Sequence, residues 1–402
     1  MEKKIFAELT KLKKEMVGSL MELVRIPAIS PESGGEGEEE KSKFVESLCK
    51  KIGFDKISHY YTFSHGIKRP NLVAKIKGKK SENRLWIIAH LDVVPPGDLK
   101  LWKSNPFASI IKNGKIFSRG TEDNGQDLIA ALYAIKAIRN LKIVPGRDIC
   151  FAALSDEETL STYGMKHLVK KGIFKKGDAF LVPDGGSPDG SLIEVAEKSL
   201  LWLEIATIGK QCHASMPEKG VNALEASSYF IYKLEELRKT FNQKNSLYEP
   251  SYSSFAPTKR LANVPNINTI PGTDTFYIDC RILPCYKISE VLRFLEKIKK
   301  EVEKEKKVKI KIKIIQKEKA TETKADSSIV KGLRQVVQRV CKVKPKVRGV
   351  GWGTCAAFVR RLGYPAVVWS KVNGVAHQPN EYARIENLLT DSKVFASLFT
   401  SF

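Results

Sequence analysis

The sequence predicts an α/β protein, in which a mixed β-sheet flanked by helices is interrupted by an inserted α+β domain. From about Lys68 onward, short apolar runs that suit strands alternate with longer stretches at helical spacing, a rhythm typical of a sheet covered on both faces. The pattern changes between residues 199 and 317, where half-exposed strands separate two amphipathic helices. We therefore expect residues 1–198 and 318–402 to form one domain in two parts, with residues 199–317 as the insertion.

The first part of the chain begins with a Lys/Glu-rich amphipathic helix, expected within Met1–Ala28. Apolar spacing predicts the later helices, and short apolar runs bounded by turn residues predict the strands. The expected strands are Leu72–Lys77, Leu85–Ala89, Asp148–Leu154 and Ala179–Val182, and the expected helices are Asn124–Asn140 and Met165–Lys171.

The insertion is predicted to run strand, helix, strand, helix, strand. These elements are expected at Ser199–Ile208, Leu224–Thr240, Thr275–Leu283, Ile288–Lys306 and Val308–Ile315. After a polar linker at Lys317–Asp326 the α/β pattern resumes, with helices at Ser327–Cys341 and Thr354–Leu362 and a strand at Ala366–Ser370.

Length and composition place the chain among globular proteins. Its 402 residues are too many for one ordinary domain, and 42% hydrophobic with 28% charged residues is a globular balance. No apolar segment approaches the ~18–20 residues that span a bilayer, and the first helix lacks the features of a signal peptide. Seven Cys without a Cys-x-x-Cys spacing favour reduced thiols. We expect a cytoplasmic protein with no membrane partner.

The formal net charge of +23 could indicate nucleic acid, an anionic surface or acidic substrates as partners. The lysines, however, are spread along the chain and interleaved with glutamates, as in residues 299–307. No basic block with interleaved aromatic residues and no nucleic-acid motif occurs. We favour solvated faces over a polyanion site and expect no nucleic-acid partner.

The strand Leu85–Ala89 leads directly into His90 and Asp92. Because side chains alternate along a strand, both project to the same face, and the carboxyl ends of strands are where open α/β sheets build sites. A His with a carboxylate two residues later suits a metal ligand and the acceptor that orients its imidazole. Taken alone, the pair is equally well explained as a polar strand end.

Further candidates follow other elements of the same sheet. Asp123 precedes a predicted helix, where an Asp is also common as a cap. Glu157 and Glu158 close a run of three acids after a strand, and such neighbours repel one another unless cations or solvent neutralise them. A solvated loop explains that run too. Asp184 and His377 each follow a predicted strand.

Two His and three carboxylates are the inventory for two divalent metals, each holding one His and one terminal carboxylate and sharing one bridging Asp. The metals would lie about 3.5–4 Å apart, and a water between them would be acidified into a nucleophile. Glu157, beside a ligand, would then be free to take the proton of that water. The five expected ligands are His90, Asp123, Glu158, Asp184 and His377.

This constellation, in this order, resembles the dinuclear zinc hydrolases that include aminoacylase, acetylornithine deacetylase, succinyl-diaminopimelate desuccinylase, glutamate carboxypeptidase and the cytosolic dipeptidases. The resemblance extends from about Ile26 to Tyr382 and implies two zinc ions per chain, with cobalt or manganese as alternatives. It assigns the ligands and their helpers as follows: His90 and Asp184 to one metal, Glu158 and His377 to the other, Asp123 as the bridge, Asp92 as the acid that orients His90, and Glu157 as the general base.

The resemblance also covers the insertion, which would be a lid and dimerisation domain. His213 lies in the stretch that matches the lid motif, where a His stabilises the oxyanion, often in the active site of a dimer partner. Asn268 and Arg281 match positions that hold the substrate carboxylate, and an Arg offers a bidentate fork for it. Gly353 and Thr354 match a Gly-rich substrate loop. A surface-loop His and a strand-face ion pair remain the simpler readings of His213 and Arg281.

We therefore expect a metal-dependent hydrolase of the amide bond in a small N-acyl amino acid or dipeptide with a free carboxylate, working as a homodimer. Asp184, where several branches have Glu, and Trp352, in place of a usual Gly, match no single member's specificity pocket. Two alternatives stay open: an aminopeptidase-type hydrolase of longer peptides, and a non-catalytic basic binding protein on the same fold.

Overall fold

A computed structural model describes residues 1–402, and the chain divides into two units, each with its own core. The first unit comprises Met1–Val195, Thr323–Arg348 and Thr354–Phe402. The second unit comprises Ala196–Glu322 with the short segment Gly349–Gly353. None of the helices is both long and apolar enough to cross a membrane.

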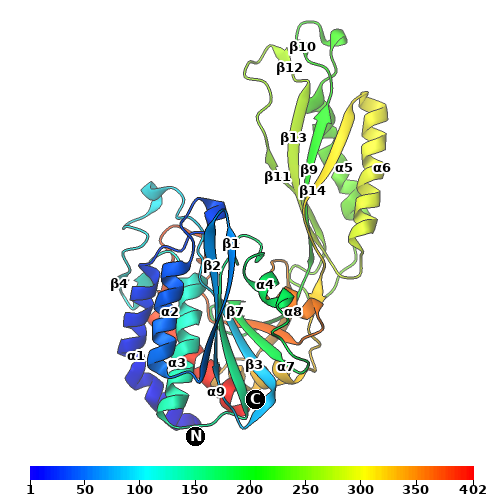
Figure 1. Ribbon diagram of the computed structural model, residues 1–402. Coiled ribbons are helices and arrows are strands. Elements are labelled where there is room, and N and C mark those ends of the chain that lie inside the picture. The colour runs from blue at the N-terminus through cyan, green and yellow to red at the C-terminus, as the bar shows by residue number, and fades with distance from the viewer. The chain divides into compact units, whose positions relative to one another are not determined.

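The main sheet has nine strands in the order β1-β2-β6-β3-β7-β17-β8-β15, with β16 paired to β8 (Figure 1). Its centre is parallel, because β3 pairs in parallel with β6 and β7, and β17 with β7, whereas β2 is antiparallel to β6. The predicted mixed sheet is confirmed. The strands are β1 (Lys56–Ser64), β2 (Ile67–Ile76), β3 (Lys80–His90), β6 (Arg147–Leu154), β7 (Ala179–Gly186), β8 (Leu192–Glu197), β15 (Thr321–Glu322), β16 (Lys346–Val350) and β17 (Ala366–Ser370).

Helices cover both faces of this sheet, as predicted. On one face, apolar residues of α4 (Met165–Lys170) and α8 (Ala356–Arg361) join those of β3, β6 and β7 in one core cluster. The other helices of the first unit pack against one another on the opposite face: α1 (Glu2–Val24), α2 (Glu39–Ile52), α3 (Gln126–Asn140), α7 (Ser328–Cys341) and α9 (Ile385–Ser401). A small sheet in the order β18-β5-β4 completes the unit, with β4 (Ile110–Lys112), β5 (Lys115–Phe117) and β18 (Tyr382–Arg384).

The second unit is an antiparallel sheet in the order β11-β13-β9-β14, packed against two helices. Inward residues alternate along β9 and β13 and bury against the helices, which is the pattern of a sheet with one covered face. The elements are β9 (Ser199–Ile208), α5 (Ala223–Thr240), β11 (Ser254–Arg260), β13 (Thr273–Ile282), α6 (Ile288–Lys306) and β14 (Lys309–Glu318), with a further pair of short strands, β10 (Cys212–His213) and β12 (Thr269–Ile270).

The polar stretch Lys317–Asp326 is not wholly a linker, which corrects that expectation. Lys317 and Glu318 extend β14 along β9, and β15 pairs with the end of β8. Pairing with a neighbouring strand overrides the low strand propensity of these charged residues. The apolar pattern also did not predict α2, β1 and α9; β1 forms by antiparallel pairing with β2.

Candidate metal centre

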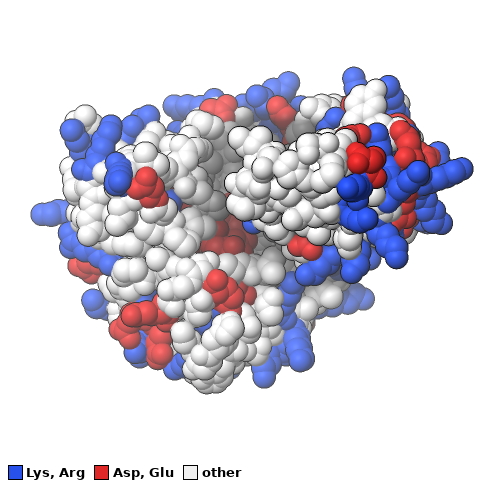
Figure 2. Space-filling model, turned by 90° about the horizontal axis from the view of Figure 1, so that it is seen from above, with Lys and Arg blue, Asp and Glu red and all other residues white.

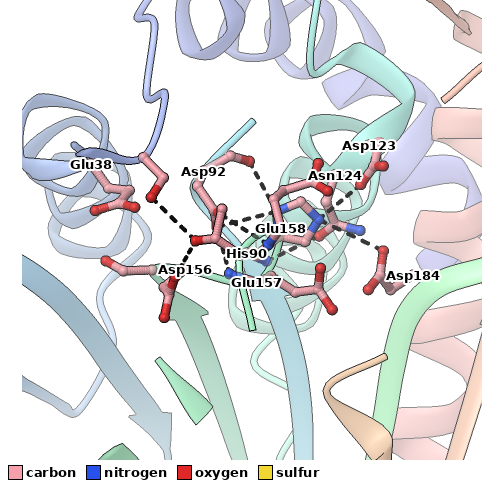
Figure 3. Close-up of polar contacts among 12 residues, drawn as sticks. Glu38, His90, Asp92, Asp123, Asn124, Asp156, Glu157, Glu158 and Asp184 are labelled. Carbon is pink, nitrogen blue, oxygen red and sulfur yellow. Dashed lines mark hydrogen bonds and ion pairs between the residues drawn. The ribbon is translucent and has the colours of Figure 1, made fainter. Parts of the chain in front are cut away.

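The candidate residues of the first unit converge at the carboxyl ends of its parallel strands (Figure 3). His90 is the last residue of β3, and Asp184 lies near the end of β7. Glu157 and Glu158 follow β6, and Asp123 lies in the single turn η3 (Thr121–Gly125) before α3. His377 comes from the loop between β17 and β18.

The imidazole of His90 is buried between carboxylates. Its Nε2 lies 2.8 Å from Asp123 Oδ1 and 3.7 Å from Asp184 Oδ1. Burial alone would lower the pKa of His90, but hydrogen bonds with Asp123, Asp184 and Asp92 outweigh it and raise the pKa well above its usual value. The surrounding acids therefore favour positive charge at this nitrogen.

His377 approaches the same Asp123 from the other side. Its Nε2 lies 3.1 Å from Asp123 Oδ2 and 3.0 Å from Glu158 Oε2. Hydrogen bonds with Asp123 and Glu158 raise the pKa of His377 to about 10. The residue adopts a left-handed φ of 64°, which is uncommon outside Gly and is typical of constrained functional loops. Each oxygen of Asp123 thus faces a different imidazole, the arrangement expected of a bridging carboxylate.

The carboxylates crowd one another in a largely buried volume. Burial, with the charge of Asp123, raises the pKa of Glu158 to about 7. Burial, with the charge of Asp184, raises the pKa of Glu157 well above its usual value. The ligand atoms of two groups lie within 4.8 Å of one another: His90, Asp123 and Glu158, and His90, Glu157 and Asp184. Hard carboxylate oxygens and imidazole nitrogens at this spacing fit divalent metals, whose charge would relieve the repulsion.

Asp92 has a wider role than the sequence indicated. The nearest partner of His90 Nδ1 is the backbone oxygen of Asp92, at 3.0 Å, with its carboxylate at 3.6 Å. That carboxylate, which is fully buried, accepts the backbone N–H groups of Glu157 and Glu158, both at 3.0 Å. The side chain of Asp92 therefore fixes the loop that carries Glu157 and Glu158, while the backbone oxygen of Asp92 orients the imidazole of His90.

A buried ion pair that the sequence did not single out holds the turn around Asp123. Arg119 Nη1 lies 2.6 Å from Glu381 Oε2, and both side chains are almost fully buried. The Glu381 carboxylate also accepts the backbone N–H groups of Gly120, Glu122 and Asp123 at 2.9–3.1 Å. Glu381 follows His377 by four residues. This closeness in the sequence was the one feature that could have indicated a role for Glu381 at the centre.

Two further side chains connect the loops of the centre. Glu122 accepts the backbone N–H groups of Asn373, Val375 and Ala376, just before His377. Asn124 accepts the N–H of His90 and donates to the oxygen of Pro183, next to Asp184. The turn that carries Asp123 is thereby tied to the three segments that carry His90, Asp184 and His377.

Replacing Glu381 by alanine is expected to destabilise the protein by about 3–5 kcal/mol, because it leaves the Arg119 charge buried without its partner. Urea unfolding of the variant measures the loss. Glu296→Ala is the matched control, since its ion pair with Lys299 is solvent-exposed and is worth at most about 1 kcal/mol. Equal effects of the two substitutions would contradict a structural role for the buried pair.

In the second unit, the structure brings His213 and Asn268 together. β10 pairs with β12, so His213 lies opposite Thr269, and the N–H of Ala214 donates to the backbone oxygen of Asn268. His213 is exposed, and its Nδ1 contacts the Ser215 side chain at 2.7 Å. The lid-motif candidate His213 and the substrate-carboxylate candidate Asn268 therefore share one tip of this unit.

Arg281 lies on β13, away from that tip. Its guanidinium forms a two-pronged pair with Asp279 and donates to the backbone oxygen of Gly351 at 2.7 Å. The Gly-rich loop that ends at Gly353 is thus held against Arg281. Thr354 belongs to the first unit, where its Oγ1 accepts the N–H of Ala356 at the start of α8.

Comparison with known proteins identifies the family. The model of peptidase family M20/M25/M40 matches residues 86–401. The chain belongs to this family. It is similar to an uncharacterized metallohydrolase of Methanocaldococcus jannaschii, with 39% identity covering 93% of this chain and 96% of that protein. It is also similar to the succinyl-diaminopimelate desuccinylase of Sulfurovum sp., with 28% identity covering 94% and 97%.

Solved structures of the M20 family share the fold. An M20 family metallo-carboxypeptidase from Sulfolobus solfataricus aligns with a TM-score of 0.77 at 22% identity, covering 96% of this chain and 100% of that one. Human carnosine dipeptidase 1 aligns with a TM-score of 0.72 at 17% identity, covering 100% and 99%. This M20 member is therefore a metal-dependent hydrolase of amide or peptide bonds, which confirms the predicted fold and class of enzyme.

Proposed function

We propose that this M20 hydrolase cleaves the amide bond of a small N-acyl amino acid or dipeptide that carries a free carboxylate. The observation that supports it most is the position of Asp123 between two imidazoles, with His90 on one oxygen and His377 on the other. Relatives whose names include desuccinylase and deacetylase agree with an acylated amino acid as substrate. Hydrolysis of longer peptides from the amino end is the second candidate, because the fold also matches an aminopeptidase.

We assign the ligands of two divalent ions, zinc first and cobalt or manganese as alternatives. His90 and Asp184 would hold one ion, and His377 and Glu158 the other, with Asp123 between them. When bound, such ions make a water acidic enough to attack at neutral pH and polarise the substrate carbonyl.

Glu157 is the general base in this proposal. It is next to Glu158 in sequence, and the two N–H groups that the Asp92 carboxylate accepts fix the backbone of both residues. The raised pKa of Glu157, caused by burial and the charge of Asp184, suits a carboxylate that must accept a proton from water. The same proton would then pass to the leaving amine.

The second unit supplies recognition in this proposal. His213 would stabilise the developing oxyanion, and Asn268 and Arg281 would hold the substrate carboxylate. Gly353 would contribute from the adjoining loop, together with Thr354 of the first unit. Because Asp279 already orients the Arg281 fork, a substrate carboxylate would meet a preset guanidinium. We also propose a homodimer through this unit.

We place the enzyme in the cytoplasm. All seven cysteines are free, and four of them are buried. Free thiols in that number suit a reducing compartment.

Metal content tests the two-ion assignment. Elemental analysis of freshly purified protein is expected to find about two zinc-like ions per chain. Dialysis against a chelator should abolish hydrolysis, and zinc should restore it. A fully active protein without metal would contradict the assignment.

A substrate panel tests the specificity. The panel compares kcat/KM for four classes of substrate: N-succinyl amino acids, N-acetyl amino acids, dipeptides and tripeptides. Each substrate is paired with a derivative whose C-terminal carboxylate is replaced by a carboxamide. We expect one of the first three classes to be preferred and its carboxamide to be cleaved poorly. Preference for tripeptides would favour the second candidate, and equal cleavage of the carboxamide would remove the role given to Arg281.

A further inference from the structure

The first unit contains a basic cavity that the proposed reaction does not use. Its volume is about 640 Å³, and it is lined by residues of α1, of the β4–β5 turn and of the start of α9. Thr10, Lys13, Lys14 and Val17 line it from α1, and this i, i+3, i+4, i+7 spacing places them on one side of the helix. Arg384 lines it from the opposite wall.

The cavity walls are fixed to one another. The N–H of Ile385 donates to the backbone oxygen of Gly114 in the β4–β5 turn. Arg384 pairs with Lys115 in the register of β18 and β5, and its Nε donates to Asn373 Oδ1 at 3.0 Å. The remaining guanidinium N–H groups of Arg384 have no protein acceptor and are available to a ligand.

The charge in this cavity is not neutralised by the protein. Four cations and one carboxylate, Glu386, line it, a net charge of +3. Three of the four acids of α1 have partners outside the cavity: Glu2 pairs with Arg339, Glu8 bonds Asn140, and Glu15 pairs with Lys136. Lys13, Lys14 and Arg384 form no ion pair at all, and Lys11 has only a distant one with Glu8, at 3.9 Å.

We propose that this cavity binds a small anion with two phosphate groups, a diphosphate or the diphosphate part of a nucleotide. Lysine ammonium groups act as point charges for phosphate, and the arginine fork fits two of its oxygens. Two phosphates come closest to balancing a charge of +3. Asn113, in the β4–β5 turn, and Thr10 add neutral polar groups at the rim. Other basic side chains are dispersed over the surface, as Figure 2 shows for one face of the molecule.

Inorganic pyrophosphate titrated into the full-length, metal-loaded protein in a calorimeter tests the proposal. We compare the wild type with the double variant K13E/K14E and with K297E/K300E, which makes the same charge change on α6 of the second unit. The wild type and K297E/K300E are expected to show saturable binding with the same affinity. In K13E/K14E the affinity should fall at least about tenfold, which corresponds to about 1.4 kcal/mol. Pyrophosphate also binds metal ions, so a binding component whose affinity is the same in the wild type and in K13E/K14E is assigned to the metal centre.

Three outcomes would overturn the site: no pyrophosphate binding beyond that component, an equal loss in both double variants, or much tighter binding of a single-stranded RNA than of pyrophosphate. Lys13 and Lys14 are exposed, so their substitution should leave the melting temperature and the hydrolytic rate unchanged. A second variant, Arg384→Gln, should weaken pyrophosphate binding independently of α1.

Discussion

Glu157→Ala is expected to lower kcat by about 10²–10⁴-fold or more, which is the contribution of a well-placed general base, while both metal ions stay bound. The Glu157 carboxylate lies within 4.8 Å of the candidate ligand atoms of His90 and Asp184, and in the proposal it holds no ion itself. Without it, water must lose its proton to bulk solvent, and the leaving amine has no donor. Steady-state kinetics with the best substrate of the panel, together with elemental analysis of the same preparation, gives both readouts.

Two further variants serve as controls for Glu157→Ala. Glu157→Asp keeps a carboxylate but withdraws it by one methylene, and should recover part of the rate. Glu296→Gln, on the exposed surface of α6, should be indistinguishable from the wild type. If Glu157→Ala loses metal together with activity, the residue is a ligand; if it keeps a near-normal rate, the proposed mechanism is wrong.

Asp92→Ala is expected to weaken metal binding or activity by about 10–100-fold, the usual effect of removing the partner of a metal-bound His. The structure adds a second consequence. The variant leaves the N–H groups of Glu157 and Glu158 buried without an acceptor, which costs about 1–3 kcal/mol for each group. Both the metal affinity and the free energy of unfolding should therefore fall, and each is measured separately.

Asp92→Asn separates the two roles of Asp92. The amide oxygen can still accept one of the two N–H groups, while the negative charge beside His90 is lost. We expect most of the stability to return but not the metal affinity. The same metal affinity and rate in Asp92→Ala as in the wild type would show that the backbone oxygen of Asp92 suffices to orient His90.

The strand ends explain why much of the candidate centre could be predicted. β3, β6 and β7 are parallel neighbours, so the residues that end or follow them must meet at one edge of the sheet. His90 and Asp184 were recognisable at the ends of apolar runs, and Glu158 was recognisable because it closes the short acidic run that follows another. Only local sequence and one general rule of sheet geometry were needed.

The supporting residues could not be predicted in this way. Arg119 and Glu381 are separated by 262 residues, and Glu122 and Val375 by 253. Nothing in either local pattern indicates which distant loop will dock there, and an acid near a helix start is most simply explained as a cap. Such contacts depend on the packed tertiary structure, which periodicity does not encode.

The position of β17 has a consequence for synthesis on the ribosome. This strand, Ala366–Ser370, lies between β7 and β8 in the sheet, although it is made more than 150 residues after both. Until it emerges, the apolar strand β7 has one unpaired edge, which is a template for pairing with other chains. The nascent protein therefore carries an aggregation-prone edge while the residues between Gly186 and Ala366 are made, and slow elongation over that stretch would prolong its need for a chaperone.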